Sequence, residues 1–250
     1  HKVCGEYISL ESYDFLLNLG LKLDEMNLPI INEVKITAPN GKYIFRPLDL
    51  GGFGISRYLI DSKLAEISKE LKVRVLDQTK VEDIEYKDNI FTIKTDKEDF
   101  YSTIACGAFG KNSNIDIKLS RNYLTNNAYN NFVGVKYHIK TDFPANRIEL
   151  HNFQGGYCGI SKIENDTYCL CYLTHSQNLR DNNNIIEKMQ ENVLFKNSYL
   201  KNYFLNSEFV FQKPLTISQI NLGKKSIVEN HLLLLGDAAG TVAPLSGNGM

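Results

Sequence analysis

Residues 232–250 read LLLLGDAAGTVAPLSGNGM, and this stretch decides how the rest of the chain is interpreted. The four leucines at 232–235 predict a short strand that is buried on both faces of a parallel sheet. Gly236 and Asp237 follow directly, which places a carboxylate at the carboxyl end of that strand, where open α/β sheets bind ligands. A carboxylate there can accept hydrogen bonds from sugar-like hydroxyl groups. The stretch therefore predicts a ligand site at the end of a buried strand.

The second half of the stretch has the composition of a tight turn into a helix. Pro244, Gly247 and Gly249 would bend the chain and leave free amide N–H groups, which suit an anionic or electron-rich ligand edge. The alternative is an ordinary strand–turn–helix junction in which Asp237 caps a helix. The length of the string favours the ligand site.

The complete string resembles the second FAD motif of the para-hydroxybenzoate hydroxylase and geranylgeranyl reductase group of flavoproteins, in which GD, a proline and G-x-G follow a buried strand. The resemblance implies that Asp237 contacts the ribityl chain of FAD. It also implies that the amides of Gly249 and Met250 lie near the flavin pyrimidine ring and the pyrophosphate. Gly236, Pro244 and Gly247 belong to the same expected cofactor site.

A second segment, residues 2–6, reads KVCGE and resembles the K-x-C-G-E stretch of reductase-like members of this group. In those relatives its backbone passes close to FAD. Cys4 and Gly5 are the contacts that the resemblance implies here. The alternative for Cys4 is a buried thiol that serves only packing.

Two further positions agree with the group in order and spacing. Arg57, with Asp61 and Leu64, resembles the R-x-x-x-D-x-x-L helix start of the group, whose arginine lies against the cofactor; a surface ion pair is the alternative. A guanidinium beside a helix N-terminus would reinforce a phosphate site. Val81 begins the strand whose backbone edge meets adenine in relatives.

Periodicity and turn residues predict the elements between these motifs. A helix is expected after Ser9, ending near Gly20, and another from Ser56 to about residue 71. A hairpin is expected around Pro39-Asn40-Gly41, with a surface loop at 178–184. The remaining expected elements are strands at 72–76, 81–86, 90–95, 100–106, 132–139, 147–153, 157–163, 167–173 and 231–235, an extended stretch at 208–219 and a helix at 185–193.

This order predicts an α/β fold with an α+β insert, in which a parallel-sheet domain is interrupted by an antiparallel one. The FAD-binding domain would comprise residues 1–30, 47–118 and 220–250. The antiparallel substrate domain would comprise residues 31–46 and 119–219.

The expected substrate domain contains one stretch of interest. Residues 156–162 resemble the G-Y-x-W-x-F-P stretch of geranylgeranyl reductases, with Gly159 in place of tryptophan. Tyr157 and Cys158 are the candidate lining of a substrate pocket, and packing in the core is the alternative for the tyrosine.

No metal site is expected, because the histidines at 138, 151 and 175 lack ligand spacing. Cys169 and Cys171 are not expected to form a disulfide, since same-strand i, i+2 thiols point in parallel.

Two departures from the group bear on the reaction. The first Gly-rich fingerprint and the acidic residue that holds the adenosine ribose are absent, and the family order places them upstream of His1, so the sequence is interpreted as a fragment. Many hydroxylases of the group have G-A-D-G where residues 107–110 read GAFG. Phe109 in place of that aspartate argues against direct use of NAD(P)H, which stays a candidate electron donor only.

Charge and composition narrow the class of ligand. Twenty-eight basic and twenty-nine acidic side chains give a formal net charge of -1, which does not suit binding to nucleic acid or to anionic lipid. Five dispersed cysteines without a CxxC pair favour a reducing cytoplasm. A small-molecule substrate is expected, with peripheral membrane contact only if that substrate is a lipid.

These observations predict an FAD-dependent oxidoreductase of reductase or dehydrogenase type that acts on a small organic or lipid-like substrate. An FAD-dependent monooxygenase is the first alternative. A more distant one is a binding protein that keeps the fold without catalysis. No side chain is expected to be catalytic in the usual sense, and the sequence does not set the oligomeric state.

Overall fold

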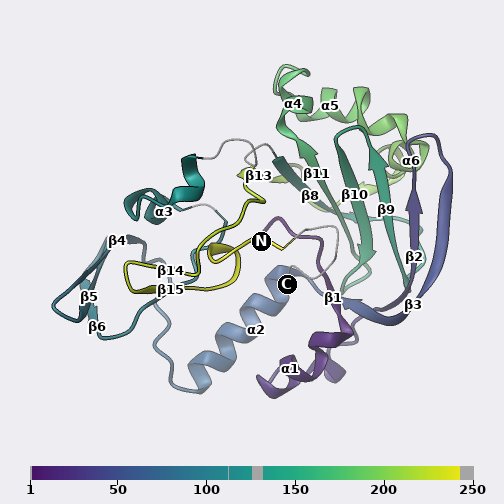
Figure 1. The fold of residues 1–250 in the computed structure, drawn as a ribbon. Coiled ribbons are helices and arrows are strands. Elements are labelled where there is room, and N and C mark those ends of the chain that lie inside the picture. The colour runs from purple at the N-terminus through teal and green to yellow at the C-terminus, as the bar shows by residue number, and fades with distance from the viewer. Residues whose placement is uncertain (1, 112, 126–131, 243–250) are drawn as a thin grey trace. The chain divides into compact units, whose positions relative to one another are not determined.

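The computed structural model describes residues 2–111, 113–125 and 132–242 (Figure 1). Its contacts divide the chain into two compact units. Among the described residues, the first comprises residues 2–73 and 132–218, and the second comprises residues 74–111, 113–125 and 219–242. The domain boundaries expected from the sequence follow function rather than contacts and stay a prediction.

The first unit is built on a large mixed sheet with the strand order β1-β3-β2-β9-β10-β11-β8-β12, in which β13 also pairs with β8. Along the order from β1 to β12, neighbouring strands are antiparallel except β2 and β9, which run parallel with Lys35 opposite Glu149. The strands are β1 (Tyr7–Ser9), β2 (Ile30–Thr37), β3 (Tyr43–Gly54), β8 (Phe132–Lys140), β9 (Arg147–Phe153), β10 (Gly156–Lys162), β11 (Tyr168–His175), β12 (Glu208–Phe209) and β13 (Leu215–Ile220).

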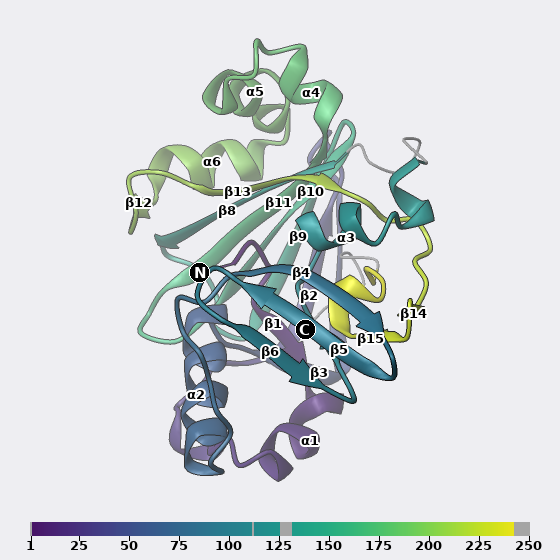
Figure 2. The same ribbon diagram turned by 90° about the vertical axis from the view of Figure 1, so that its left-hand side faces the viewer.

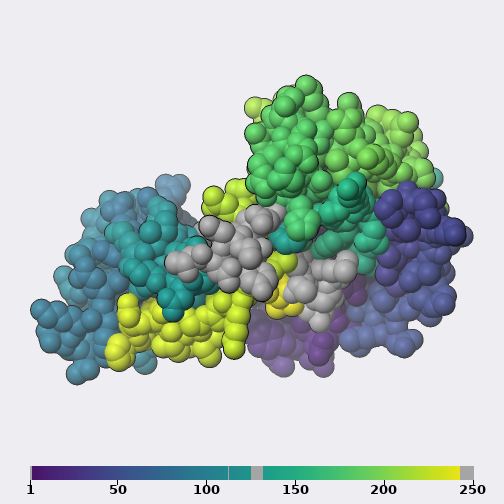
Figure 3. Space-filling view, turned by 45° about the horizontal axis from the view of Figure 1, so that its top comes forward, coloured from purple at the N-terminus to yellow at the C-terminus, as the bar shows by residue number. Residues whose placement is uncertain are grey.

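Side chains alternate between the two faces of this sheet, as the two-residue period of a strand requires. On β8, Val133, Val135 and Ile139 enter a hydrophobic core, so Lys136 and His138 lie on the opposite face. Three helices cover the core side: α4 (Ser176–Arg180), α5 (Ile186–Asn192) and α6 (Ser198–Asn206). Figures 1 and 2 show them along one side of the strands, and their green atoms form a continuous surface in Figure 3. We call the other side, which these three helices do not cover, the uncovered face.

Two more helices of the first unit pack around a smaller core. They are α1 (Tyr13–Asn18) and α2 (Arg57–Glu70), and Phe53, Ile55 and Ile60 belong to the buried cluster between them and the end of β3. The Ser56 side chain accepts a hydrogen bond from the Leu59 amide and so caps α2. Gly20, at φ +94°, ends the α1 region in a conformation that favours glycine. Both helices and the hairpin of β2 and β3 agree with the sequence prediction.

The second unit contains two small sheets and one helix. An antiparallel meander is formed by β4 (Val81–Lys87), β5 (Ile90–Thr95) and β6 (Asp99–Ser102). The other sheet has the order β14-β15-β7, from β14 (Val228–Glu229), β15 (Leu232–Leu234) and β7 (Cys106–Gly107), and β15 runs parallel to β7. Helix α3 (Asn114–Lys118) begins with a capping box of Ser113 and Asp116.

Several local predictions are wrong. Residues 72–76 form no strand, and Val73 and Leu76 are exposed. The leucine run is buried on one face only: Leu232 and Leu234 enter a hydrophobic cluster, whereas Leu233 and Leu235 are 42% and 45% exposed, because that cluster lies on one side of β15. The expected loop at 178–184 begins inside helix α4, and α6 was not predicted.

The expected fold class is confirmed, since a large mixed sheet of mainly antiparallel strands accompanies a short parallel pair. Among the described residues, no helix is both long and apolar enough to cross a membrane.

Candidate active site

The first candidate segment, residues 2–6, lies against the uncovered face of the large sheet. Lys136 of β8 donates a hydrogen bond from Nζ to the carbonyl oxygen of Lys2 at 2.9 Å. Cys169 of β11 donates from Sγ to the carbonyl oxygen of Cys4 at 3.3 Å. A Cβ added to Gly5 would meet no atom within 4 Å, so the space beside Gly5 is open. The backbone at Cys4 and Gly5 is thus held from one side by the sheet.

Glu6 ends this segment and is completely buried. Its carboxylate accepts hydrogen bonds from the Arg57 amide at 2.7 Å and from the Lys136 ammonium group, and His138 Nε2 lies 2.6 Å from its second oxygen. Burial alone would raise the pKa of Glu6, but His138 and Lys136 together bring that pKa below its usual value. Glu6 is therefore ionised, and it connects segment 2–6, helix α2 and strand β8. The resemblance implies cofactor contacts only for the two residues before Glu6, Cys4 and Gly5.

Arg57 stands at the start of α2, as the sequence predicts. Its guanidinium group donates two hydrogen bonds to Asp61, at 3.1 and 3.0 Å. The arginine side chain is 23% exposed, and Lys2 Nζ lies 3.8 Å from the same carboxylate. The ion pair, which is the alternative to a cofactor contact, is therefore present. A role of Arg57 beside a cofactor stays a prediction.

His138, Cys169 and Glu6 also bring three side chains with metal-ligating atoms within 4.8 Å of one another. Sequence spacing did not predict this group, because its members are far apart in the chain. The Lys136 ammonium group already contacts the Glu6 carboxylate, and a metal ion there would meet this positive charge. Burial raises the pKa of the Cys169 thiol, which keeps it in the neutral form that binds metal poorly.

The two candidate pocket residues of β10 lie on opposite faces. Cys158 is fully buried in the core beneath the helices, and burial raises the pKa of its thiol. Tyr157 pairs with Leu173 of β11 and lies on the uncovered face together with Lys136 and His138. Only Tyr157 is therefore on the same side of the sheet as segment 2–6. Its role in a pocket stays a prediction.

A small pocket of about 160 Å³ lies on the uncovered face of the large sheet, next to strand β8. Lys136 and His138 contribute from β8, and the rest of the lining comes from Phe211, Lys213 and Leu215. The sequence did not indicate this pocket, because its lining joins a strand to a segment without a motif.

In the second unit, Gly236 and Asp237 follow β15 as a single turn of 3-10 helix, Gly236–Ala238. Gly236 has φ +56°, a conformation that glycine adopts without strain. The Asp237 side chain is 33% exposed, and Lys111 Nζ lies 3.9 Å from its carboxylate. Lys225 donates from Nζ to the Asp237 carbonyl oxygen at 3.0 Å. The carboxylate at the end of the strand is accessible while its backbone is fixed.

A buried arginine that sequence analysis missed supports the same turn. Arg121 has a fully buried side chain and donates hydrogen bonds to Asp116 at 2.7 Å, to the Ala238 carbonyl oxygen at 2.8 Å and to the Ser226 carbonyl oxygen at 2.8 Å. No motif marks Arg121, although an arginine just after a short capped helix was the available signal. The turn at 236–238 is thus fixed by hydrogen bonds from Arg121 and Lys225 to two of its carbonyl oxygens.

The remaining predicted cofactor contacts are Val81, which the structure describes, and four residues that it does not describe. Val81 is the first residue of β4, an edge strand of the meander, and it is 44% exposed. Pro244, Gly247, Gly249 and Met250 lie outside the described residues, so their roles stay predictions.

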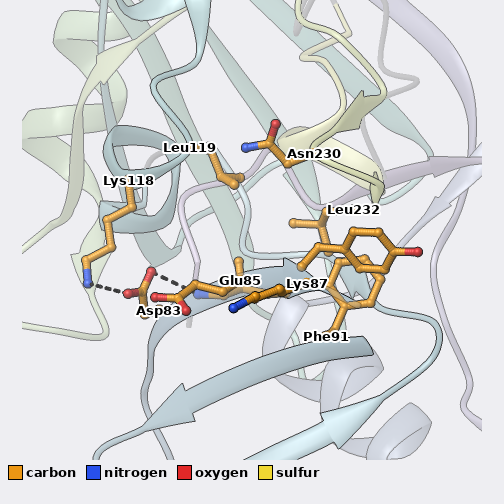
Figure 4. A pocket seen from close by; sticks show the side chains of 10 residues that line it. Asp83, Glu85, Lys87, Phe91, Lys118, Leu119, Asn230 and Leu232 are labelled. Carbon is orange, nitrogen blue, oxygen red and sulfur yellow. Dashed lines mark hydrogen bonds and ion pairs between the residues drawn. The ribbon is translucent and has the colours of Figure 1, made fainter. Parts of the chain in front are cut away.

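A larger hollow of about 620 Å³ lies in the second unit (Figure 4). Its wall carries charges of both signs, and Lys118 Nζ lies 3.4 Å from the Asp83 carboxylate. None of the predicted cofactor contacts is among its lining residues, which are Asp83, Ile84, Glu85, Tyr86, Lys87, Phe91, Lys118, Leu119, Asn230 and Leu232.

Comparison with known proteins identifies this fold among solved structures. No protein-family model matches the chain, and no curated protein matches it. A triple mutant of the flavin-dependent brominase Bmp2 is similar over 100% of this chain and 67% of its own, with a TM-score of 0.78 and 16% identity. A flavoprotein/dehydrogenase from Cytophaga hutchinsonii is similar over 100% of this chain and 65% of its own, with a TM-score of 0.77 and 15% identity.

A third structure, the halogenase PltM in complex with phloroglucinol and FAD, is similar over 89% of this chain and 50% of its own, with a TM-score of 0.70 and 14% identity. The chain thus spans from one half to two thirds of the length of these three structures. At such identities the similarity establishes the fold.

Proposed function

We propose that this chain is part of an FAD-dependent oxidoreductase that acts on a small organic molecule. The observation that carries the proposal is the turn at Gly236 and Asp237, which leaves the end of β15 with an accessible carboxylate on a backbone held by Arg121 and Lys225. This geometry fits a ligand with hydroxyl groups, such as the ribityl chain of FAD. Three flavoproteins that share the fold support the choice of FAD.

One other position also fits this cofactor. Gly5 leaves open space beside a fixed backbone, whereas the amides of Ser56 and Arg57 at the start of helix α2 already bind the carboxylates of Glu164 and Glu6. A flavin supplies electron transfer when it is bound, and the protein supplies orientation, charge compensation and exclusion of water. In this chain, Asp237 would bind sugar hydroxyls, and contact of the cofactor with Cys4 and Gly5 stays what the resemblance implies.

For the reaction type, we propose a reductase or dehydrogenase. The support is the C-G-E sequence of residues 4–6 and Phe109, whose ring packs in the hydrophobic cluster of the second unit rather than offering a polar group. The similar structures include both halogenases and a dehydrogenase, so a monooxygenase-type reaction is the second candidate. Transfer of labelled oxygen from O2 into the product would favour that second candidate. NAD(P)H stays a candidate electron donor, with Phe109 as the argument against its direct use.

The first prediction concerns Asp237. Asp237→Asn keeps the size of the side chain and removes its charge, so we expect the Kd for FAD to rise about 10- to 100-fold, the equivalent of one charged hydrogen bond. The measurement is titration of the purified full-length protein with FAD, followed by flavin fluorescence and the visible spectrum. Asp99→Asn, at an exposed carboxylate of β6, is the matched control and should leave the Kd unchanged.

Two outcomes would contradict the proposal. A wild-type protein that shows no flavin bands after addition of FAD would reject the cofactor and favour a non-catalytic binding protein. An Asp237→Asn variant with wild-type affinity would remove Asp237 from the site.

A further inference from the structure

Glu6 is held in a conformation and an environment that are both unfavourable for a glutamate. Its backbone has φ +55°, in the left-handed region that side chains other than glycine seldom adopt. Its side chain is 0% exposed, so the carboxylate is separated from water. Such a residue persists only where its surroundings compensate both costs.

The compensation comes from three donors on two different elements. The Arg57 amide belongs to the first turn of α2, whereas Lys136 and His138 belong to β8, and all three contact the same carboxylate. The Glu6 carbonyl oxygen also accepts a hydrogen bond from the Ile55 amide at 3.1 Å. The carboxylate therefore joins the sheet to the residue at which α2 starts.

The same strands hold the backbone just before Glu6. Lys136 reaches the carbonyl oxygen of Lys2 as well as the Glu6 carboxylate, and Cys169 reaches the carbonyl oxygen of Cys4. Segment 2–6 is thus fixed at its beginning, middle and end by side chains of β8 and β11. Both segments expected to border the cofactor, at Cys4–Gly5 and at Arg57, meet at this one carboxylate.

We propose that Glu6, Lys136 and His138 are positioning residues, which fix segment 2–6 and the start of α2 in the geometry that cofactor binding needs. This inference rests on the proposed function. Removal of Glu6 or Lys136 would leave a buried charge without its ionic partner and release the segment from the sheet. We call these three residues the Glu6 cluster.

A second buried carboxylate provides a matched control. Glu149 of β9 is 2% exposed and is surrounded by Lys35, Arg147 and His151, but it lies on the helix-covered face of the sheet. Glu149→Gln therefore removes a comparable buried charge without touching either segment. A purely structural role for Glu6 would give both variants the same behaviour.

The experiment has one readout without FAD and one with it. In the FAD-free protein, the rate at which a thiol reagent modifies Cys4 is followed by peptide mass spectrometry. We expect Glu6→Gln to raise that rate about tenfold or more, because modification follows the open population of segment 2–6. We also expect it to raise the Kd for FAD about 10- to 100-fold. Glu149→Gln should change neither quantity, even where it lowers the melting temperature.

Further variants keep the test decisive if Glu6→Gln folds poorly. The double variant Glu6→Gln/Lys136→Met leaves no unpaired buried charge, so it should melt higher than Lys136→Met while keeping fast Cys4 modification and weak FAD binding. The side chain of His138→Gln can still donate a hydrogen bond to Glu6, so this variant should keep the slow Cys4 modification of the wild type. His138→Phe cannot donate and should show faster modification.

The results separate the two proposals. Equal Cys4 rates in Glu6→Gln and Glu149→Gln would overturn the positioning role. A wild-type protein that binds no FAD would defeat the proposed function, while a faster Cys4 rate in Glu6→Gln alone would still support the Glu6 cluster as the group that fixes segment 2–6.

Discussion

Arg121 shows how much a single buried side chain can fix. Its guanidinium group is fully buried and binds Asp116, Ser226 and Ala238 in three separate parts of the second unit. Its planar fork of donors suits such divergent acceptors, and it stays charged at any relevant pH. Loss of this side chain would leave Asp116 as a buried charge without its partner.

We therefore expect Arg121→Met to lower the free energy of unfolding by about 3–5 kcal/mol, as measured by urea denaturation. The control is Arg74→Met, whose ion pair with Glu98 is exposed on both sides and should contribute less than about 1 kcal/mol. Equal losses in the two variants would show that the buried contacts of Arg121 do not stabilise the second unit.

At this scale the sequence named some residues of the candidate site, whose roles stay predictions. Asp237, Cys4 and Gly5 stand in recognisable strings, and the structure gives each a defined place. Their supports, Glu6 and Arg121, could not be identified as such, because a glutamate or an arginine in a sequence is most often exposed. Burial of a charge depends on partners more than 100 positions away, as for Glu6 with Lys136.

Helix α2 is the element that local signals determine most completely. Ser56 caps its first turn, the apolar stripe turns toward the core that contains Phe53, and Lys69 stands in its last turn. These features act within one or two turns, so they can be recognised without the tertiary structure. The helix in turn sets the position of Arg57.

For this helix we expect Ser56→Ala to cost about 1 kcal/mol of the free energy of unfolding, because the Leu59 amide loses its hydrogen-bond partner. Ser68→Ala, inside the same helix, is the control and should be neutral or slightly stabilising, since alanine is the better helix former. Chemical denaturation of both variants would measure the difference. An unchanged stability in Ser56→Ala would mean that the capping bond contributes nothing.

The strand predicted at residues 72–76 did not form, which shows that a strand needs a neighbouring strand to pair with. Residues 72–76, KVRVL, alternate apolar and polar side chains as a strand does, yet Val73 is 56% exposed and the segment is irregular. The pattern of β10 is no clearer, but β10 lies between β9 and β11 and pairs with both. A strand is stable when partners satisfy its backbone groups, and sequence alternation does not reveal whether partners exist.

At the scale of the whole molecule, the large sheet of the first unit carries buried charge on both of its faces. On the helix-covered face, Glu149 gathers Lys35 from β2, Arg147 and His151 from β9 and the Tyr203 hydroxyl from α6. Burial lowers the pKa of the His151 imidazole below its usual value. The pKa of Glu149 is also lowered, because His151 and Lys35 outweigh the opposing effect of burial.

Both shifts make the protein less stable in acid. Below a pH of about 6.5 the unfolded chain binds a proton at His151 that the folded chain does not, so the free energy of unfolding decreases as the pH falls from there toward the folded pKa. The contribution of Glu149 is present above a pH of about 4.5 and is lost as the pH falls through its folded pKa. We expect urea denaturation to show falling stability between pH 7 and pH 5, with a smaller slope in His151→Gln.

The exposed His175 provides the control, and His175→Gln should keep the wild-type slope. Slopes are compared rather than absolute stabilities, because His151→Gln also loses packing. A wild-type slope in His151→Gln would assign the acid sensitivity to other groups.

The sequence by itself determined the helices α1 and α2, the hairpin of β2 and β3, most strands and the turn at Gly236 and Asp237. Their signals are local: caps, turn residues and the periods of helix and strand. Only the tertiary structure decided which face of β15 is buried and which charges lie inside the sheet. It alone joined Glu6 to β8 and α2, because long-range burial and charge pairing depend on which distant segments meet.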